Sequence, residues 1–169
     1  MEFAEYVARQ RPALMRFATV LTCQTWLAED LVSDVLGRAF ERWDRISGMA
    51  EPNAYVRRMV VNEYLSWRRR LARTTPRAEV EPNAAGHGDG ADERAERDAM
   101  IQRLAGLPRK QRAAVVLRYY AGLPDAEIAV QLGCREPTVR SQIHRALAAL
   151  RIDMTADTTA SPHAYQETS

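Results

Sequence analysis

The residues best suited to chemistry are basic and polar side chains on one face of a helical pattern over residues 138–150 and just before it. Guanidinium groups can bind phosphates and the edge of guanine, so these residue types suit contacts with nucleic acid. The opposite face is apolar, at steps of three and four residues. The apolar face carries Val139, Ile143, Ala146, Leu147 and Leu150. The polar face carries Arg135, Arg140, Gln142, His144 and Arg145.

A shorter apolar pattern precedes this one and stops at a glycine. Ile128, Ala129 and Leu132 recur at helical spacing, and Gly133 can supply a corner at which a side chain would be strained. The small Ala129 lets a second helix cross close to the first. Two short helices around such a corner are typical of a helix-turn-helix, whose second helix lies in the major groove of DNA. The alternative is an ordinary helical hairpin with a solvated basic face.

Other kinds of reactive site have no support in the sequence. Cys23 and Cys134 lie far apart, and His87, His144 and His163 lack the spacing of a metal site. No glycine-rich phosphate loop or nucleophile elbow is present. We therefore predict no catalytic residue, no metal, no cofactor and no small-molecule substrate, and hence a protein that is not an enzyme.

Composition and charge narrow the class of protein further. Hydrophobic residues make up 46% of the 169 residues and charged residues 27%, which is typical of a soluble globular protein. No apolar run approaches the roughly 18 residues that span a bilayer, and the N-terminus does not resemble a secretory signal. We expect a cytoplasmic protein without membrane insertion. The net charge is +3 over residues 1–73, −4 over 74–98, +6 over 99–151 and −3 over 152–169, so two basic modules indicate a polyanionic partner.

The elements that position these residues all read as helices. Residues 3–22 predict a helix that Pro12 bends or splits, and Thr25 is the expected N-cap of a helix over 26–43. The apolar face of the second helix runs from Leu31 to Trp43 and includes Phe40. Residues 44–53 predict a loop.

A long helix is expected to start at an Asn53 cap and to end near residue 73. Its apolar stripe consists of Val56, Val60, Tyr64, Trp67 and Leu71. Residues 74–95 lack a periodic apolar face and predict a flexible acidic linker. Helices follow from residue 96 to 105 and over 109–121, and residues 152–169 predict a disordered tail. The residues of the helix over 109–121 that are expected mostly inward are Val115, Val116, Leu117, Tyr119 and Tyr120. The fold class is therefore all-α, with two small helical domains joined by a linker.

Three blocks of this chain resemble bacterial RNA polymerase sigma factors of the extracytoplasmic-function group, most of all the actinobacterial sigma-E-like family. The blocks are AEDLVSDVLGRAFERW (28–43), NAYVRRMVVNEYLSWRRR (53–70) and LPRKQRAAVVLRYYAGLPDAEIAVQLGCREPTVRSQIHRAL (107–147). They occur in the family's order, with the linker in the family's place. The resemblance implies a factor that binds core RNA polymerase and directs promoter-specific initiation, and it implies an anti-sigma factor as a further partner.

The same resemblance assigns roles to the two domains. Residues 1–73 would be sigma region two, which binds core polymerase and recognises and melts the minus-ten element, and residues 96–151 would be region four, which recognises the minus-thirty-five element. The polymerase-binding set on the second helix is Glu29, Asp30, Asp34, Arg38, Glu41 and Arg42. A solvated face with ion pairs between neighbouring turns is the alternative for this set.

Promoter opening needs cations for phosphates and surfaces or pockets for unpaired bases. The predicted minus-ten set is Met49, Asn53, Arg57, Arg58, Asn62, Trp67, Arg68, Arg69 and Arg70. Within it, Met49 and Asn53, together with Ala50, would line a pocket for a flipped base. Trp67, like Tyr64 and Trp43, fits core packing as well as stacking on DNA.

Region four departs from the family pattern where its recognition helix should start, near Arg135. The family commonly has Ser-x-Gly-Thr there, and this chain has Arg135-Glu136-Pro137-Thr138. Pro137 is tolerable in a first turn, and Arg135 could bind guanine or phosphate in place of a serine cap. The predicted minus-thirty-five set is Arg112, Arg118, Arg135, Thr138, Arg140, Ser141 and Arg145, with Arg140 as the main base reader.

A free-standing transcriptional regulator that uses only the C-terminal helix-turn-helix is the alternative function. It would make residues 1–73 a receiver or dimerisation domain. The sequence has no alternation of strands and helices to build a receiver, and such a regulator leaves the arginine-rich helix over 53–73 unexplained.

Overall fold

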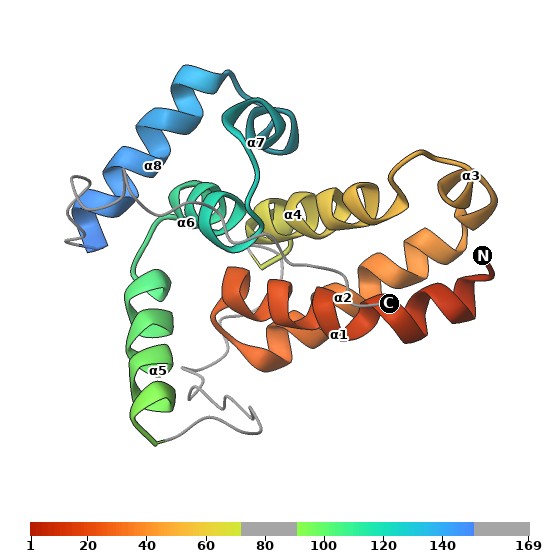
Figure 1. Ribbon diagram of the computed structural model, residues 1–169, viewed down its shortest axis with the longest axis horizontal. Helices are drawn as coiled ribbons and strands as arrows, with labels where there is room; N and C mark the ends of the chain where they lie inside the picture. The colour runs from red at the N-terminus through yellow and green to blue at the C-terminus, as the bar shows by residue number, and fades with distance from the viewer. Residues whose placement is uncertain (72–90, 151–169) are drawn as a thin grey trace.

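The computed structural model describes residues 1–71 and 91–150, and the side chains of residues 1–66 and 93–150. Every regular element in these ranges is a helix, which confirms the all-α prediction (Figure 1). The predicted tail, 152–169, lies outside the described residues, as does the predicted linker up to residue 90. Residues 91–95, predicted as linker, form the start of a helix instead.

The N-terminal half is built from α1 (Phe3–Thr22), α2 (Thr25–Phe40), the short α3 (Trp43–Ser47) and α4 (Pro52–Leu71). α1 and α2 pack side by side, and α4 crosses both (Figure 1). α1 is not split, since Pro12 lies inside it. It ends at Cys23, whose backbone is left-handed with φ 58° and whose N–H donates to the Thr19 carbonyl at 2.8 Å.

Three local predictions in this half are wrong. Gln24 holds the N-cap position of α2 with an extended backbone, and Thr25 is the first helical residue. α4 begins at Pro52, so Asn53 lies in its first turn and is not the cap; proline suits a first helical position because that position needs no N–H donor. Part of the predicted loop over 44–53 is α3, which is too short to show an apolar period.

The C-terminal half contains α5 (Ala91–Ala105), α6 (Arg109–Val115), η1 (Val116–Tyr120), α7 (Asp125–Leu132) and α8 (Glu136–Leu150). η1 is a π-helical turn that continues α6, and the Ala121 N–H donates five residues back to the Val116 carbonyl at 3.0 Å. The wider turn disturbs the period of 3.6 residues at the end of the helix. Val115, Val116 and Leu117 are buried, as predicted, whereas Tyr119 and Tyr120 are 52% and 46% exposed, so the inward prediction is wrong for these two residues.

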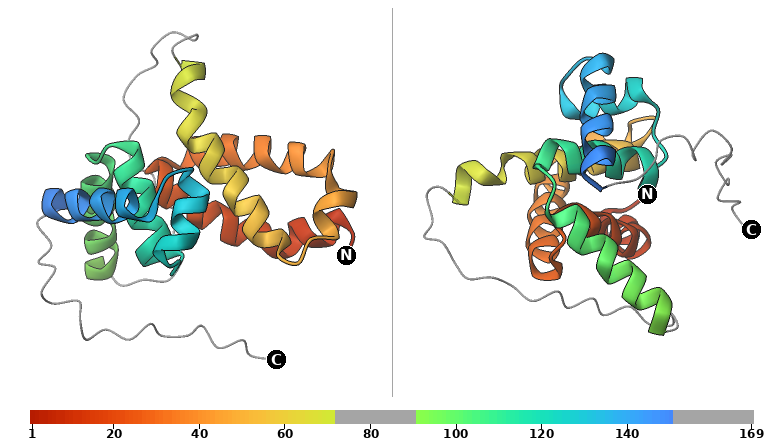
Figure 2. Two further views of the ribbon diagram at one scale, coloured as in Figure 1. Left: turned by 90° about the horizontal axis from the view of Figure 1, so that it is seen from above. Right: turned by 90° about the vertical axis from the view of Figure 1, so that its left-hand side faces the viewer.

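The two halves are docked against each other through one continuous apolar core. The buried cluster runs from Tyr6 and Val35 in the N-terminal half to Leu117 and Ile128 in the C-terminal half. α4 contacts α6 and α7, and α1 contacts α5 and η1; Figure 2 shows this arrangement from two further sides. Arg109 adds a polar link, because its guanidinium donates to the Tyr64 carbonyl at 3.0 Å and lies 5.4 Å from the centre of the Tyr64 ring.

Candidate nucleic-acid interface

The helix-turn-helix forms as its sequence predicts. Gly133 ends α7 in a left-handed conformation with φ 63°, and the Cys134 N–H donates to the Ala129 carbonyl at 3.0 Å. α8 begins at Glu136, with Pro137 in its first turn. All five residues of its predicted apolar face are buried, which fixes which side of α8 faces outward.

The outward side of α8 carries most of the predicted minus-thirty-five residues. Arg135, Thr138, Arg140, Ser141 and Arg145 are all exposed. Each of the three arginines can donate to a phosphate or to a guanine edge. The fold therefore brings these five residues to one accessible stretch at and after the turn.

A carboxylate of α7 connects two of the predicted DNA-contact arginines. Asp125 accepts hydrogen bonds from Arg118 in η1 and, at 3.3 Å, from Arg140 in α8. Glu136 lies 3.6 Å from the same Arg140 nitrogen. The Arg140 side chain is 57% exposed and the Arg118 side chain 34%. Asp125 thus orients both guanidinium groups while Arg140 remains open to solvent.

Arg112, also predicted to contact phosphate, has a different environment. Its guanidinium donates to the carbonyls of Leu21 and Thr22 at the end of α1, at 3.2 and 3.4 Å. It also donates to the carbonyls of Ala105 and Leu107, at 2.8 and 3.2 Å. A cation suits these positions because the last carbonyls of a helix lack partners and carry partial negative charge. These contacts make Arg112 a link between the two halves, and its predicted phosphate contact stays a prediction.

The predicted minus-ten residues of α4 whose side chains are described differ in how far they are exposed to solvent. Asn53, Arg58 and Asn62 are exposed, and Arg57 is half-buried with its guanidinium 5.9 Å from the centre of the Phe17 ring. Met49 is half-buried in the turn after α3. The side chains of Trp67, Arg68, Arg69 and Arg70 lie outside the described residues.

Two of the aromatic residues that were predicted either to pack in the core or to stack on DNA belong to the core. Trp43 is 8% exposed and donates its indole N–H to the Met1 carbonyl at 3.0 Å. Tyr64 is 2% exposed, and burial raises its pKa to about 12, against the lowering effect of Arg112 and Arg109. Stacking on DNA is therefore excluded for both in this arrangement.

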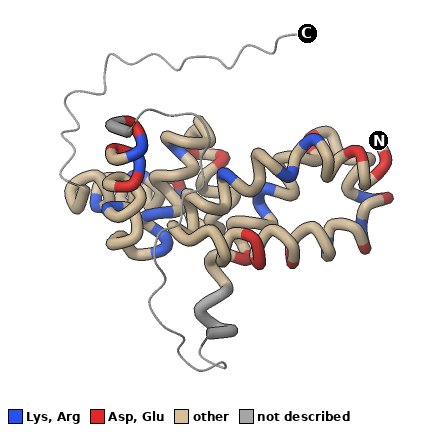
Figure 3. Tube along the Cα trace, turned by 90° about the horizontal axis from the view of Figure 1, so that it is seen from below, with Lys and Arg blue, Asp and Glu red and all other residues tan. Residues whose placement is uncertain are grey.

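The predicted polymerase-binding face of α2 is largely open. Glu29, Asp30, Asp34, Glu41 and Arg42 are exposed. Arg38 is half-buried, and its guanidinium lies 2.6 Å from a carboxylate oxygen of the buried Glu63 in α4. Figure 3 shows the basic and acidic positions along the trace, with both signs on the helices of each half.

Two features of this surface were missed from the sequence. Phe40 of α2 is 64% exposed, although its spacing predicts an inward position, and its ring lies 5.1 Å from that of Phe3. Glu63 anchors Arg38 from a position directly beside the apolar stripe of α4. An acid beside a core stripe is a signal for a buried ion pair, because an unpaired carboxylate is costly there.

Neither a metal site nor a membrane span is found in the described part of the chain. No group of three or more potential ligands among the described residues could hold a metal ion. None of the described helices is long and apolar enough to cross a membrane. Cys23 and Cys134 are both free thiols.

Comparison with known proteins agrees with this architecture. The protein-family model for sigma-70 region 2 matches residues 6–74, and the family model for sigma-70 region 4 matches residues 97–150. The RNA polymerase sigma-E factor of Streptomyces avermitilis is 36% identical over 91% of this chain and 86% of its own length. That of Streptomyces coelicolor is 34% identical over 92% and 88%, respectively.

A solved structure shares the arrangement of helices. The sigma factor RpoE from Bartonella quintana, in complex with the anti-sigma factor NepR, superposes with a TM-score of 0.71 at 26% identity, covering 88% of this chain and 94% of that one. The N-terminal and C-terminal halves both match their family models, so a helix-turn-helix regulator with an unrelated N-terminal domain is not favoured. The chain belongs to the sigma-70 family of RNA polymerase sigma factors, in the extracytoplasmic-function group and of the sigma-E-like type.

Proposed function

We propose that this sigma factor divides promoter recognition between its two halves. Residues 1–73 bind core RNA polymerase and recognise and melt the minus-ten element, and residues 96–151 recognise the minus-thirty-five element. The observation that carries the proposal is the helix-turn-helix, in which α8 buries five apolar residues and turns Thr138, Arg140, Ser141 and Arg145 outward, with the exposed Arg135 directly before it. This is the geometry that a recognition helix needs in order to enter a major groove.

The other contacts follow from exposure and charge. The exposed acids of α2, with Glu41 and Arg42 directly after the helix, form the polymerase-binding surface, and Phe40 is an apolar contact beside them. Asn53, Arg57, Arg58 and Asn62 of α4 contact the minus-ten element, since they supply cations for phosphates and an amide for base edges. Arg118 joins the minus-thirty-five set through its shared carboxylate with Arg140.

The proposal includes a regulator and a compartment. An anti-sigma factor holds the chain inactive, by analogy with the structural relative solved in such a complex. The chain works in the cytoplasm, where core polymerase and promoter DNA are found. It positions DNA and polymerase and does no chemistry itself.

Run-off transcription with purified components tests the function. The chain is mixed with core RNA polymerase and DNA from upstream of its own gene, and binding to core polymerase is measured in parallel by pull-down. The expected result is core binding together with a promoter-dependent transcript. DNA binding without core binding would contradict the proposal and favour a free-standing regulator. A charge-reversed α2 variant, Asp30→Arg with Asp34→Arg, should lose core binding while it keeps DNA binding.

A further inference from the structure

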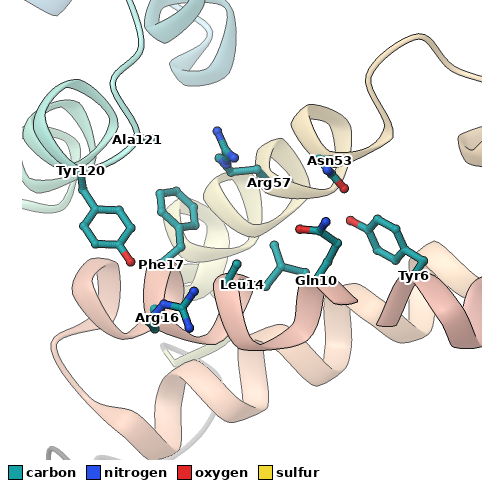
Figure 4. Close-up of a pocket in the computed structure, with 10 residues that line it drawn as sticks. Tyr6, Gln10, Leu14, Arg16, Phe17, Asn53, Arg57, Tyr120 and Ala121 are labelled. Atoms are coloured by element: carbon teal, nitrogen blue, oxygen red, sulfur yellow. The ribbon is translucent and has the colours of Figure 1, made fainter. Parts of the chain in front are cut away.

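A cavity of about 380 Å³ lies between the two halves, lined by α1, α4 and the end of η1. Its size falls in the lower part of the range for small-ligand sites. Figure 4 shows the side chains that line it, with Tyr120 and Ala121 on the side of the C-terminal half. A ligand in this cavity touches both halves at once.

One end of the cavity gathers hydrogen-bonding groups. In Figure 4 the polar ends of Tyr6, Gln10 and Asn53 point toward one another. The Tyr6 side chain is fully buried, and its hydroxyl has no hydrogen-bond partner within the described parts of the chain. Burial raises the pKa of Tyr6 to about 12, with a smaller lowering effect of Arg57, so the hydroxyl stays protonated at neutral pH. A buried hydroxyl without an acceptor lowers the stability of the protein, and a bound ligand with an acceptor atom would remove this cost.

The charge of the cavity is positive. Arg16 and Arg57 line it, and no Asp or Glu is among the described residues that do so. Arg57, the two side-chain amides and the protonated Tyr6 hydroxyl can each donate hydrogen bonds to an anion, whereas Arg16 lies toward the Tyr120 end of the cavity (Figure 4). The chemistry therefore favours a phosphate or a similar anion over a neutral ligand.

The other end of the cavity is aromatic. The rings of Phe17 and Tyr120 lie 6.2 Å apart, and Tyr120 is 46% exposed. An exposed ring beside guanidinium groups is a stacking surface for a nucleobase. An anion site at one end and a stacking surface at the other match the two parts of a nucleotide.

We propose that this cavity binds a free mononucleotide, with its phosphate among Tyr6, Gln10, Asn53 and Arg57 and its base against Tyr120. Because Tyr120 belongs to the C-terminal half, the bound nucleotide stabilises the docked arrangement. Asn53 and Arg57 are also proposed minus-ten contacts, so the nucleotide competes with promoter DNA. This last consequence rests on the proposed function, whereas the binding itself does not.

Isothermal titration of the full chain with GMP, AMP, guanosine and inorganic phosphate tests the site. A mononucleotide should bind at least about tenfold more tightly than guanosine or inorganic phosphate, because only the nucleotide fills both ends. Absence of mononucleotide binding, or equal binding of inorganic phosphate alone, would overturn the proposal. The run-off assay is separate, so failure of the site and failure of the sigma function are distinguishable.

Matched variants locate the binding. Arg57→Gln and Tyr120→Leu should each weaken mononucleotide binding by about tenfold, the loss expected for a charged hydrogen bond or a stacked base. Arg11→Gln, at an exposed arginine of α1, and Tyr119→Leu alter residues that do not line the cavity, and each should leave mononucleotide binding unchanged. Equal losses in both members of a pair would overturn the assignment.

A final comparison distinguishes binding of a free mononucleotide from binding of a nucleotide within a promoter DNA strand. Tyr120→Leu should weaken GMP or AMP binding but leave binding of a minus-ten single-stranded oligonucleotide unchanged, because the strand binds the N-terminal half alone. If the variant leaves both unchanged, or if only the oligonucleotide binds, the cavity is no site for a free nucleotide and the proposal is wrong.

Discussion

Asp125 at the start of α7 accepts a hydrogen bond at 3.3 Å from Arg140, the arginine at the centre of the outward side of α8. The same carboxylate binds Arg118 of η1. Three elements of the C-terminal half thus meet at one acidic side chain. In the proposed role of Arg140 as a base reader, its guanidinium exchanges this anionic partner for DNA when the protein binds its promoter. Substitutions of Arg140 and of Asp125 should therefore have different effects: the first on binding to the cognate promoter sequence, the second on binding to DNA of any sequence.

Arg140→Ala should weaken binding to the cognate minus-thirty-five element by roughly 1–3 kcal/mol and relax the preference at one base pair. The reason is that a bidentate guanidinium contact distinguishes guanine from the other bases. Fluorescence anisotropy on cognate and single-substituted duplexes at fixed salt measures both effects. An equal loss on every sequence would instead identify Arg140 as a phosphate contact.

Asp125→Asn should have the opposite effect on non-specific DNA, raising the affinity for it. The substitution frees Arg118 and Arg140 from a competing carboxylate, so each can neutralise a phosphate. The plot of log affinity against log salt should steepen by about one for each new phosphate contact. Glu127→Gln, which removes an exposed acid from the same helix, is the matched control. Equal salt slopes for Asp125→Asn and Glu127→Gln would show that Asp125 does not restrain the arginines.

Arg112→Met should destabilise the docked protein by about 2–4 kcal/mol. It removes a guanidinium that donates to the carbonyls of Leu21, Thr22, Ala105 and Leu107, and methionine keeps only the apolar stem. Urea unfolding followed by circular dichroism gives the free energy of unfolding. Arg103→Met, at an exposed position of α5, should change it by less than about 0.5 kcal/mol. A similar small change for Arg112→Met would contradict its role as a link between the halves.

Stability should fall as the pH rises from about 10 toward 12. Burial raises the pKa of Tyr6 and of Tyr64 to about 12 in the folded protein, from an ordinary value of 10.0. Between these values the unfolded chain has lost protons that the folded chain keeps, so the free energy of unfolding decreases with pH. Denaturant titrations across this range measure the slope, and Tyr64→Phe should make it shallower. Tyr120→Phe, at an exposed position, serves as the comparison, and an equal effect of the two variants would argue against the prediction.

Much of the local structure followed from the sequence because helices are specified by nearby residues. The apolar period of α8 correctly identified all five of its buried residues, and Gly133 correctly marked the corner. Local signals failed where helices start and where the turn widens. Gln24 holds the cap position expected of Thr25, α4 already begins at Pro52, before its expected Asn53 cap, and the π turn exposes Tyr119 and Tyr120.

The sequence by itself determined the class of fold, the helix-turn-helix and the basic face that we propose for promoter recognition. Only the tertiary structure decided what each long side chain contacts. A helical period tells which side of a helix is buried but not which partner covers it, and an arginine reaches far enough to join any of several neighbours. Packing of the two halves turned Arg112 toward main-chain carbonyls and enclosed a cavity beside Arg57. Both features depend on residues from the two halves meeting across the interface, which no local pattern encodes.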